Sequence, residues 1–346
     1  MAHDASKTTK YGIGMKQKVV VFSQIDAEVL QRLEQRYHVV VINPKAGDVN
    51  TQIRKQVADA DAMIGTGRLL NQNNLETAKQ LKIISSVSVG YDNYDLNYLN
   101  QAKIWLSHTP HVLTETTADL AFTLLMSAAR QVPYLDQWTK TGQWSRTVGQ
   151  AQFGQEIFGQ TLGIIGLGNI GAAIARRGFR GFNMNILYHG RREKLELAQP
   201  LNARFCELNE LLEQSDFIVV AVDLNAHTQH LIDAEAFKKM QSHAIFVNIS
   251  RGAVVDEQAL IQALEQKQIF AAGLDVYENE NGIFFKDLSN KVLVDDLFEK
   301  LRSYSNVLIT GHQAFLTQEA LTSISQITME NLSNWEQFGK SPNDLN

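Results

Sequence analysis

The segment that decides the fold runs Gly163-Ile164-Ile165-Gly166-Leu167-Gly168-Asn169-Ile170-Gly171 and continues as Ala172-Ala173-Ile174-Ala175. The β-branched start is typical of a buried strand, the glycine-rich part of a tight turn, and the alanine-rich part of a helix. The glycines Gly166, Gly168 and Gly171 let the backbone turn sharply and approach a pyrophosphate, to which the helix amino terminus presents free N–H groups. Because strand, turn and helix follow in this order, the segment predicts dinucleotide binding.

The next expected strand, 185–188, is followed by His189-Gly190-Arg191-Arg192. An acidic residue at the end of this strand would bind the ribose 2′-hydroxyl of NAD, and none stands there. Two guanidinium groups can instead pair with a 2′-phosphate through forked hydrogen bonds. We therefore expect NADP(H) to be preferred and to contact His189, Arg191 and Arg192. The alternative is a solvated basic loop, and use of NAD(H) stays open because Glu193 offsets part of the charge.

Short β-branched runs alternate with stretches of helical periodicity in two series, which predicts an α/β fold with two doubly wound parallel sheets. Strands are expected at 18–22, 38–42, 62–64, 81–85 and 104–106, and then at 161–165, 185–188, 216–222, 244–248, 271–276 and 307–310. A capped helix is expected to run from Thr114 to Ala129 between the two series, and helical spacing returns over 318–338.

The domain organisation follows from these two series. If the last helix packs on the first sheet, the first domain is discontinuous in sequence. We expect a flavodoxin-like substrate domain of residues 15–113 and 314–346, and a Rossmann cofactor domain of residues 114–313 inserted into it. Residues 1–14 are polar and are expected to form a mobile extension.

Composition excludes several classes of partner. The 346 residues carry 32 Lys and Arg against 37 Asp and Glu, a net charge of −5, so nucleic acid and anionic membrane are not expected partners. No apolar run approaches the about 20 residues that a membrane span needs. Cys206 is the one cysteine, so a reducing, cytoplasmic location is expected. The histidine pairs 108/111 and 227/230 have no third ligand nearby in sequence, so no metal site is expected.

Three reactive groups follow expected strands, at the carboxyl ends where open α/β sheets bind ligands. They are Arg251, Glu280 and His312. A guanidinium can hold a carboxylate and a carbonyl, and a histidine can transfer a proton near neutral pH. A carboxylate at Glu280 can orient and charge that imidazole. The three residues together favour reduction of a 2-oxoacid.

Three motifs in combination resemble the D-2-hydroxyacid dehydrogenase family, and the resemblance covers nearly all of the chain from Met15. They are the turn 166–171, the run Val247-Asn248-Ile249-Ser250-Arg251-Gly252-Ala253-Val254-Val255-Asp256, and the run Gly273-Leu274-Asp275-Val276-Tyr277-Glu278. The resemblance implies that Arg251, Glu280 and His312 are the catalytic set.

The same resemblance implies the remaining contacts. It places the substrate carboxylate on the backbone of Val89 and Gly90, and it places Asp275 near the nicotinamide. The other residues implied to line the cofactor are Asn169, Ile170, Val222, Asp223, Thr228, Ile249 and Ser250. By the same resemblance, the apolar linking helix from Thr114 suggests a homodimer.

Different parts of this sequence resemble two different branches of the family. Residues 15–240 resemble glyoxylate/hydroxypyruvate (2-ketogluconate) reductases, whereas the part from Asn281 to Thr317 resembles D-lactate dehydrogenases. Phe315 would place an aromatic wall beside the substrate C3 group, which favours pyruvate and formation of D-lactate. Hydroxypyruvate and glyoxylate stay open because an apolar pocket rejects one hydroxyl poorly, and Phe315 is as well explained by core packing.

Two further alternatives come from other functional classes. Formate oxidation is disfavoured, because glutamine would be expected at the position of Glu280. A dinucleotide-sensing protein similar to corepressors of this fold would retain much of the same site. Turnover of a small oxoacid would separate an enzyme from such a sensor, whereas cofactor binding would not.

Overall fold

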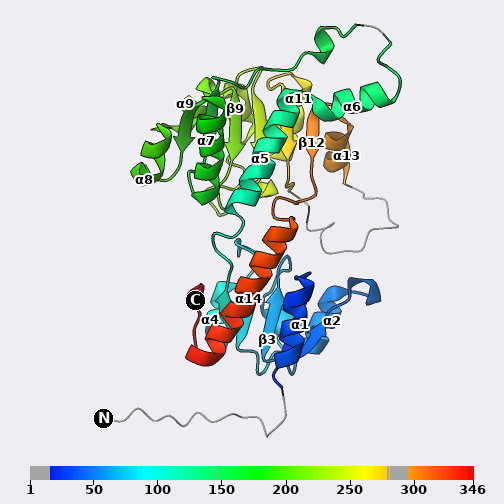
Figure 1. The fold of residues 1–346 in the computed structure, drawn as a ribbon, viewed down its shortest axis with the longest axis vertical. Coiled ribbons are helices and arrows are strands. Elements are labelled where there is room, and N and C mark those ends of the chain that lie inside the picture. The colour runs from blue at the N-terminus through cyan, green and yellow to red at the C-terminus, as the bar shows by residue number, and fades with distance from the viewer. Residues whose placement is uncertain (1–15, 146, 279, 281–294) are drawn as a thin grey trace. The chain divides into compact units, whose positions relative to one another are not determined.

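The structure is a computed structural model that describes residues 16–145, 147–278, 280 and 295–346. The expected extension 1–14 and the connection 281–294, on which part of the lactate dehydrogenase resemblance falls, lie outside these residues. The described residues form two compact units (Figure 1). The first consists of 16–112 together with Leu321–Asn346, and the second lies between Leu113 and Ala320.

The first unit is built on a parallel sheet with the strand order β2-β1-β3-β4-β5. Its strands are β1 (Lys18–Val21), β2 (His38–Val41), β3 (Ala62–Gly65), β4 (Ile83–Ser86) and β5 (Trp105–Ser107). Its helices are α1 (Ala27–Arg36), α2 (Val49–Val57), α3 (Gln72–Leu75), α4 (Leu96–Ala102), the short η1 (Pro44–Ala46) and most of α14 (Gln318–Phe338).

Helix α14 is fastened to this sheet although it comes from the end of the chain (Figure 1). Ser85 of β4 donates its hydroxyl to the Thr328 carbonyl oxygen at 3.0 Å. The backbone N–H of Asp26, the N-cap of α1, donates to the Ser325 hydroxyl at 2.9 Å. Both serines and Thr328 are at most 1% exposed, so these hydrogen bonds tie α14 into the interior of the first unit.

The second unit is built on a parallel sheet with the strand order β12-β11-β10-β9-β6-β7-β8. Its strands are β6 (Thr161–Ile165), β7 (Asn185–His189), β8 (Arg204–Phe205), β9 (Phe217–Val220), β10 (Ile245–Asn248), β11 (Ala271–Leu274) and β12 (Val307–Ile309). The order reverses between β6 and β9, which creates the switch point where such sheets bind ligands.

Helices cover both faces of this sheet. One core cluster packs α5 (Thr114–Ala129) and α7 (Asn169–Phe182) on one face, and another packs α9 (Leu208–Gln214), α10 (Ala234–Lys239) and α11 (Glu257–Glu265) on the other. The remaining elements are α6 (Val132–Lys140), η2 (Gln150–Gln152), α8 (Leu195–Ala198), η3 (Gln199–Leu201), η4 (Gly252–Val254) and α13 (Asp296–Ser303). The α/β class with two doubly wound parallel sheets is therefore confirmed.

Several details differ from expectation, among them the end of β11 at Leu274 rather than 276. Strand β8 was not anticipated, since two residues are too few to show periodicity. Strand β9 ends at Val220 rather than 222, because its pairing with β6 and β10 stops at Val220. The expected side-chain cap of the helix at Thr114 is wrong: the N-cap position is taken by Leu113, whose side chain cannot accept a hydrogen bond.

Candidate active site

Three glycines shape the turn between β6 and α7. Gly166 has a φ of +102°, and a Cβ there would lie 2.4 Å from the Ala221 carbonyl oxygen. A Cβ at Gly171 would lie 2.1 Å from the Gly166 carbonyl oxygen, so α7 packs on the turn only without a side chain. A Cβ at Gly168, the N-cap of α7, would meet no described atom within 4 Å. This open space before a helix amino terminus fits a pyrophosphate.

The residues expected to select the dinucleotide end or follow β7. His189 is half-buried; its Nδ1 lies 3.0 Å from the Cys206 carbonyl oxygen, and its ring stacks on Phe205. Arg191 and Arg192 are exposed, so both guanidinium groups are accessible to a phosphate. Burial raises the pKa of the Cys206 thiol, which disfavours a reactive thiolate at neutral pH.

The other expected cofactor residues follow the turn or the neighbouring strands β9 and β10. Asn169 and Asp223 are exposed, Ile170, Val222 and Thr228 are half-buried, and Ile249 and Ser250 are buried. The Thr228 hydroxyl donates to the Asp223 carbonyl oxygen at 2.6 Å and accepts from the Asn225 N–H at 2.8 Å. Because β10, β9 and β6 are adjacent, these residues share the carboxyl edge of the sheet with the glycine turn.

The turn that carries Arg251 is braced by Asn248, the last residue of β10. The Asn248 Oδ1 accepts hydrogen bonds from the N–H and the hydroxyl of Ser250, at 3.0 and 2.8 Å. Its Nδ2 donates to the Arg251 carbonyl oxygen at 3.0 Å. The Arg251 Nη1 donates to the Ser250 carbonyl oxygen at 2.9 Å. The backbone under the guanidinium is thus fixed by a buried amide, since Asn248 is 1% exposed.

His312 and Glu280 form a hydrogen-bonded pair. His312 Nδ1 lies 2.9 Å from Glu280 Oε1, and the two side chains are 24% and 11% exposed. The second carboxylate oxygen of Glu280 accepts the Tyr277 N–H at 3.3 Å. His312 has a φ of +53°, an uncommon value for a non-glycine residue that is typical of functional sites. The carboxylate therefore fixes the orientation of the imidazole.

Asp275, which was expected near the nicotinamide, is fully buried and holds the loop that carries His312. Its carboxylate accepts the Thr310 hydroxyl at 2.6 Å, the Gln313 N–H at 2.7 Å and the Ala314 N–H at 3.0 Å. Its carbonyl oxygen accepts the His312 N–H at 2.7 Å. Four hydrogen bonds to one residue offset the uncommon backbone conformation of His312.

The expected substrate residues fall in both units. In the second unit, the half-buried Phe315 ring stands edge-on to the His312 ring, with centroids 6.1 Å apart and planes at 82°. In the first unit, Val89 and Gly90 follow β4 and are half-buried. The Val89 carbonyl oxygen lies 3.0 Å from His108 Nδ1, so this segment is braced by a histidine.

Sequence reasoning missed two residues of this region. Asn248 could have been found, because an asparagine side chain often accepts the N–H of the residue two positions later and so forms an Asx-turn, here with Ser250. Glu257 could not have been found, because an acidic residue directly after the N-cap Asp256 is common at the start of solvent-exposed helices. The structure instead buries Glu257 to 4% exposure.

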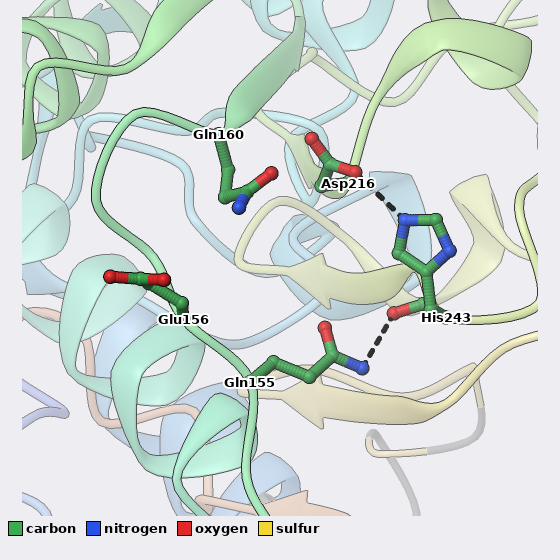
Figure 2. Close-up of a pocket in the computed structure, with 5 residues that line it drawn as sticks. All are labelled: Gln155, Glu156, Gln160, Asp216 and His243. Carbon is green, nitrogen blue, oxygen red and sulfur yellow. Dashed lines mark hydrogen bonds and ion pairs between the residues drawn. The ribbon is translucent and has the colours of Figure 1, made fainter.

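A polar pocket of about 330 Å³ lies at the other end of this sheet (Figure 2). It is lined by Gln155, Glu156, Gln160, Asp216 and His243. The His243 Nε2 lies 2.7 Å from Asp216 Oδ1, and Gln155 donates to the His243 carbonyl oxygen (Figure 2). Gln160 and Asp216 directly precede β6 and β9, so the pocket is at the amino ends of the strands and is separate from the candidate active site.

No described group of three or more His, Cys, Asp and Glu side chains is arranged to hold a metal ion. Within the same ranges, no helix combines the length and the apolar character that crossing a bilayer requires.

Comparisons with known proteins identify the family. Residues 122–314 match the model of the D-isomer specific 2-hydroxyacid dehydrogenase NAD-binding domain. The chain is 39% identical over 321 residues to glyoxylate/hydroxypyruvate reductase B of Shigella dysenteriae, which covers 92% of this chain and 94% of the relative. The chain belongs to the D-isomer specific 2-hydroxyacid dehydrogenase family. It is therefore an oxidoreductase with a nicotinamide dinucleotide cofactor.

Solved structures of a glyoxylate reductase and of a D-lactate dehydrogenase resemble this 2-hydroxyacid dehydrogenase. A glyoxylate reductase from Paecilomyes thermophila is 29% identical with a TM-score of 0.80, covering 95% of this chain and 98% of that one. A D-lactate dehydrogenase from Aquifex aeolicus, in complex with NAD and lactic acid, is 25% identical with a TM-score of 0.80, covering 92% and 95%. Both branches expected from the sequence are thus found among its relatives.

Proposed function

We propose that this dehydrogenase reduces small 2-oxoacids to D-2-hydroxyacids, with His312 as the proton donor. The hydrogen bond between His312 Nδ1 and Glu280 Oε1, 2.9 Å long and largely shielded from water, carries the proposal. A dinucleotide whose pyrophosphate is held at the glycine turn would supply the hydride from its reduced nicotinamide. As hydride reaches the carbonyl carbon, negative charge develops on the oxygen. Arg251 binds the carboxylate and this oxygen, and Glu280 orients the His312 ring that gives the proton.

The two ring nitrogens of His312 have different roles in this proposal. Nδ1–H is directed to Glu280, so the proton for the substrate oxygen leaves from Nε2. The backbone N–H groups of Val89 and Gly90 are the proposed further anchor of the substrate carboxylate. Asp275 acts on the reaction by holding the His312 loop, in addition to its proposed place near the nicotinamide.

Pyruvate is the proposed preferred substrate. The Phe315 ring stands edge-on to His312, so a C3 group of a bound oxoacid would meet an apolar wall. A methyl group gains from that wall, whereas a hydroxymethyl group would lose a hydrogen bond to water. This favours D-lactate formation.

Glyoxylate or hydroxypyruvate is the second candidate, because the reductase B relative is 39% identical over 92% of this chain. Phe315→Ala tests the choice. If the ring lines the substrate, the ratio of kcat/KM for pyruvate to that for hydroxypyruvate falls by about 10-fold, the low end of what one methylene is worth in an apolar pocket. An unchanged ratio would mean that Phe315 packs the core, and it would favour glyoxylate or hydroxypyruvate as the substrate.

The remaining features of the proposal concern cofactor, assembly and location. We propose a preference for NADP(H) over NAD(H), supported by the exposed Arg191 and Arg192 after β7. A homodimer in the cytoplasm is proposed from the resemblance to the family and the single cysteine. We also propose that residues 15–113 with 314–346 bind the substrate and that residues 114–313 bind the cofactor. A dinucleotide-sensing role is the non-enzymatic alternative, and measurable turnover would exclude it as the sole function.

A further inference from the structure

The loop after β11 reaches Glu280 through one tightly enclosed peptide group, between Tyr277 and Glu278. Gly252, next to Arg251 in the chain, lies directly against it. A Cβ at Gly252 would lie 1.9 Å from the Tyr277 carbonyl carbon and 2.3 Å from the Glu278 nitrogen. Any side chain there would displace the peptide, so the loop and the Arg251 turn are in backbone contact.

Glu257, the first residue of α11, holds the other side of this peptide. Its Oε1 accepts the Glu278 N–H at 2.5 Å. The Tyr277 N–H, on the preceding peptide group, donates to Glu280 Oε2, while Glu280 Oε1 meets His312. Glu257 is therefore linked to Glu280 through two successive peptide groups of the loop, and Glu280 contacts the imidazole.

The surroundings of Glu257 are negatively charged. Glu278 and Glu280 from the loop, and Asp295 at the N-cap of α13, all act on it. The nearby Glu278 carboxylate is itself paired, since its Oε1 lies 2.7 Å from His230 Nε2. Burial, more than these charges, raises the pKa of Glu257 to about 7, against the lowering effect of the Glu278 N–H. A carboxyl group accepts that N–H in either protonation state.

We propose that Glu257 is a positioning residue for proton transfer: its carboxyl oxygen fixes the Tyr277–Glu278 peptide and thereby sets Glu280 against His312. The inference rests on the proposed function of the Glu280–His312 pair and adds to it a residue that touches neither substrate nor cofactor. Burying a glutamate beside three other carboxylates costs more free energy than burying a hydrophobic residue there. The proposed positioning role explains why a glutamate stands at this place in α11.

Two substitutions separate positioning from general destabilisation. Glu257→Ala removes the acceptor and leaves the Glu278 N–H without its partner, whereas Glu257→Gln keeps an acceptor oxygen and removes the ionisation. Glu265→Gln is the matched control, since Glu265 ends the same helix, is 45% exposed and pairs with Lys300 at the surface. All variants are compared as full chains.

Kinetics with pyruvate and NADPH give the first readout. We expect Glu257→Ala to lower kcat by about 10-fold or more, since a displaced proton donor loses its reaction geometry, with the KM for NADPH changed by less than about two-fold. Glu257→Gln should restore most of the lost kcat, and Glu265→Gln should match the wild type. Equal loss in the alanine and glutamine variants, or no loss in either, would overturn the proposal.

The pH profile gives a readout that a structural role would not move. Ionisation of Glu257 adds a negative charge beside Glu280, so the wild-type kcat profile should carry a component near pH 7 that Glu257→Gln lacks. Identical profiles would contradict the inference.

Hydrogen exchange of the cofactor-free protein tests the loop without turnover. A peptide covering 271–278 should exchange faster in Glu257→Ala than in the wild type, and Glu257→Gln should protect it as the wild type does. If the wild type turns over no oxoacid while this exchange pattern holds, the proposed function fails and the positioning contact stands. If the wild type is active and the pattern is absent, the inference alone fails.

Discussion

At the scale of single residues, His312 is held by contacts that differ in kind. Its side chain meets Glu280, and its backbone N–H is bonded to the carbonyl oxygen of Asp275. The first contact sets the orientation of the ring, and the second fixes the position of the loop. In the proposed mechanism, the ring that gives the proton is therefore already held in place before substrate binds.

Replacing His312 tests this assignment. His312→Ala should lower kcat by about 100-fold or more, the usual contribution of general acid catalysis, with the Kd for NADPH changed by less than about two-fold. The control is His243→Ala, because His243 also pairs with a carboxylate but lies at the amino ends of the strands. Kinetics and cofactor titration measure both. Wild-type turnover in His312→Ala would remove the residue from the mechanism.

Glu257 should also make stability depend on pH. Its pKa is about 7 in the folded chain against an ordinary value of 4.5, so between these values the folded state binds more protons than the unfolded state. Stability from this group is present below about pH 4.5 and is lost as the pH rises through 7. Glu257→Gln lacks the ionisation, so the Tm of the variant minus that of the wild type should increase as the pH rises from about 5 to about 8. A Tm difference independent of pH would contradict this assignment.

At the scale of elements, the glycine turn makes a prediction about cofactor binding. Gly168 has an allowed φ of −86° and open space at its Cβ position, so Gly168→Ala should fold normally and fill the proposed pyrophosphate space. We expect the Kd for NADPH to rise by about 10-fold, or about 1.4 kcal/mol, with Tm unchanged. The control is Gly181→Ala in the same helix, where a Cβ also meets no described atom within 4 Å. Equal affinities in both variants would argue against the proposed placement.

The loop after β7 makes a separate prediction. Arg191→Ala combined with Arg192→Ala should raise the KM for NADPH by about 10-fold or more and leave the KM for NADH within about two-fold, because only the 2′-phosphate pairs with these groups. Initial rates with the two cofactors measure this ratio. If both KM values rise together, the arginines do not select the phosphate.

How far the elements could be predicted from sequence depends on how local their causes are. Helix α14 (Gln318–Phe338) was predicted over the same residues, because helical spacing is a property of the segment's own sequence. Strand β8 was missed because its two residues are defined by pairing with β7 and not by their own pattern. At the site, Arg251 and His312 could be recognised by residue type after a strand, whereas the contact of Glu257 with Glu278 joins residues 21 apart and exists only once the sheet has formed.

At the scale of the whole molecule, the family assignment and the substrate assignment rest on different observations. The family follows from a match over residues 122–314 and from relatives that cover 92% of the chain. The proposed substrate depends on one ring, Phe315, and on residues of the first unit. Fold does not determine substrate, since the two enzyme types among its relatives share this architecture.

The central claim is that this chain is a 2-oxoacid reductase that uses His312 as its acid. The most direct test is the initial rate of nicotinamide oxidation with NADPH and NADH, each against pyruvate, hydroxypyruvate, glyoxylate and phenylpyruvate, in the wild type and in His312→Ala. We predict oxidation of NADPH that is fastest with pyruvate or phenylpyruvate and is lost in the variant. Fastest turnover of glyoxylate or hydroxypyruvate would overturn only the assignment of Phe315. No oxidation with any of the four acids would contradict the claim itself.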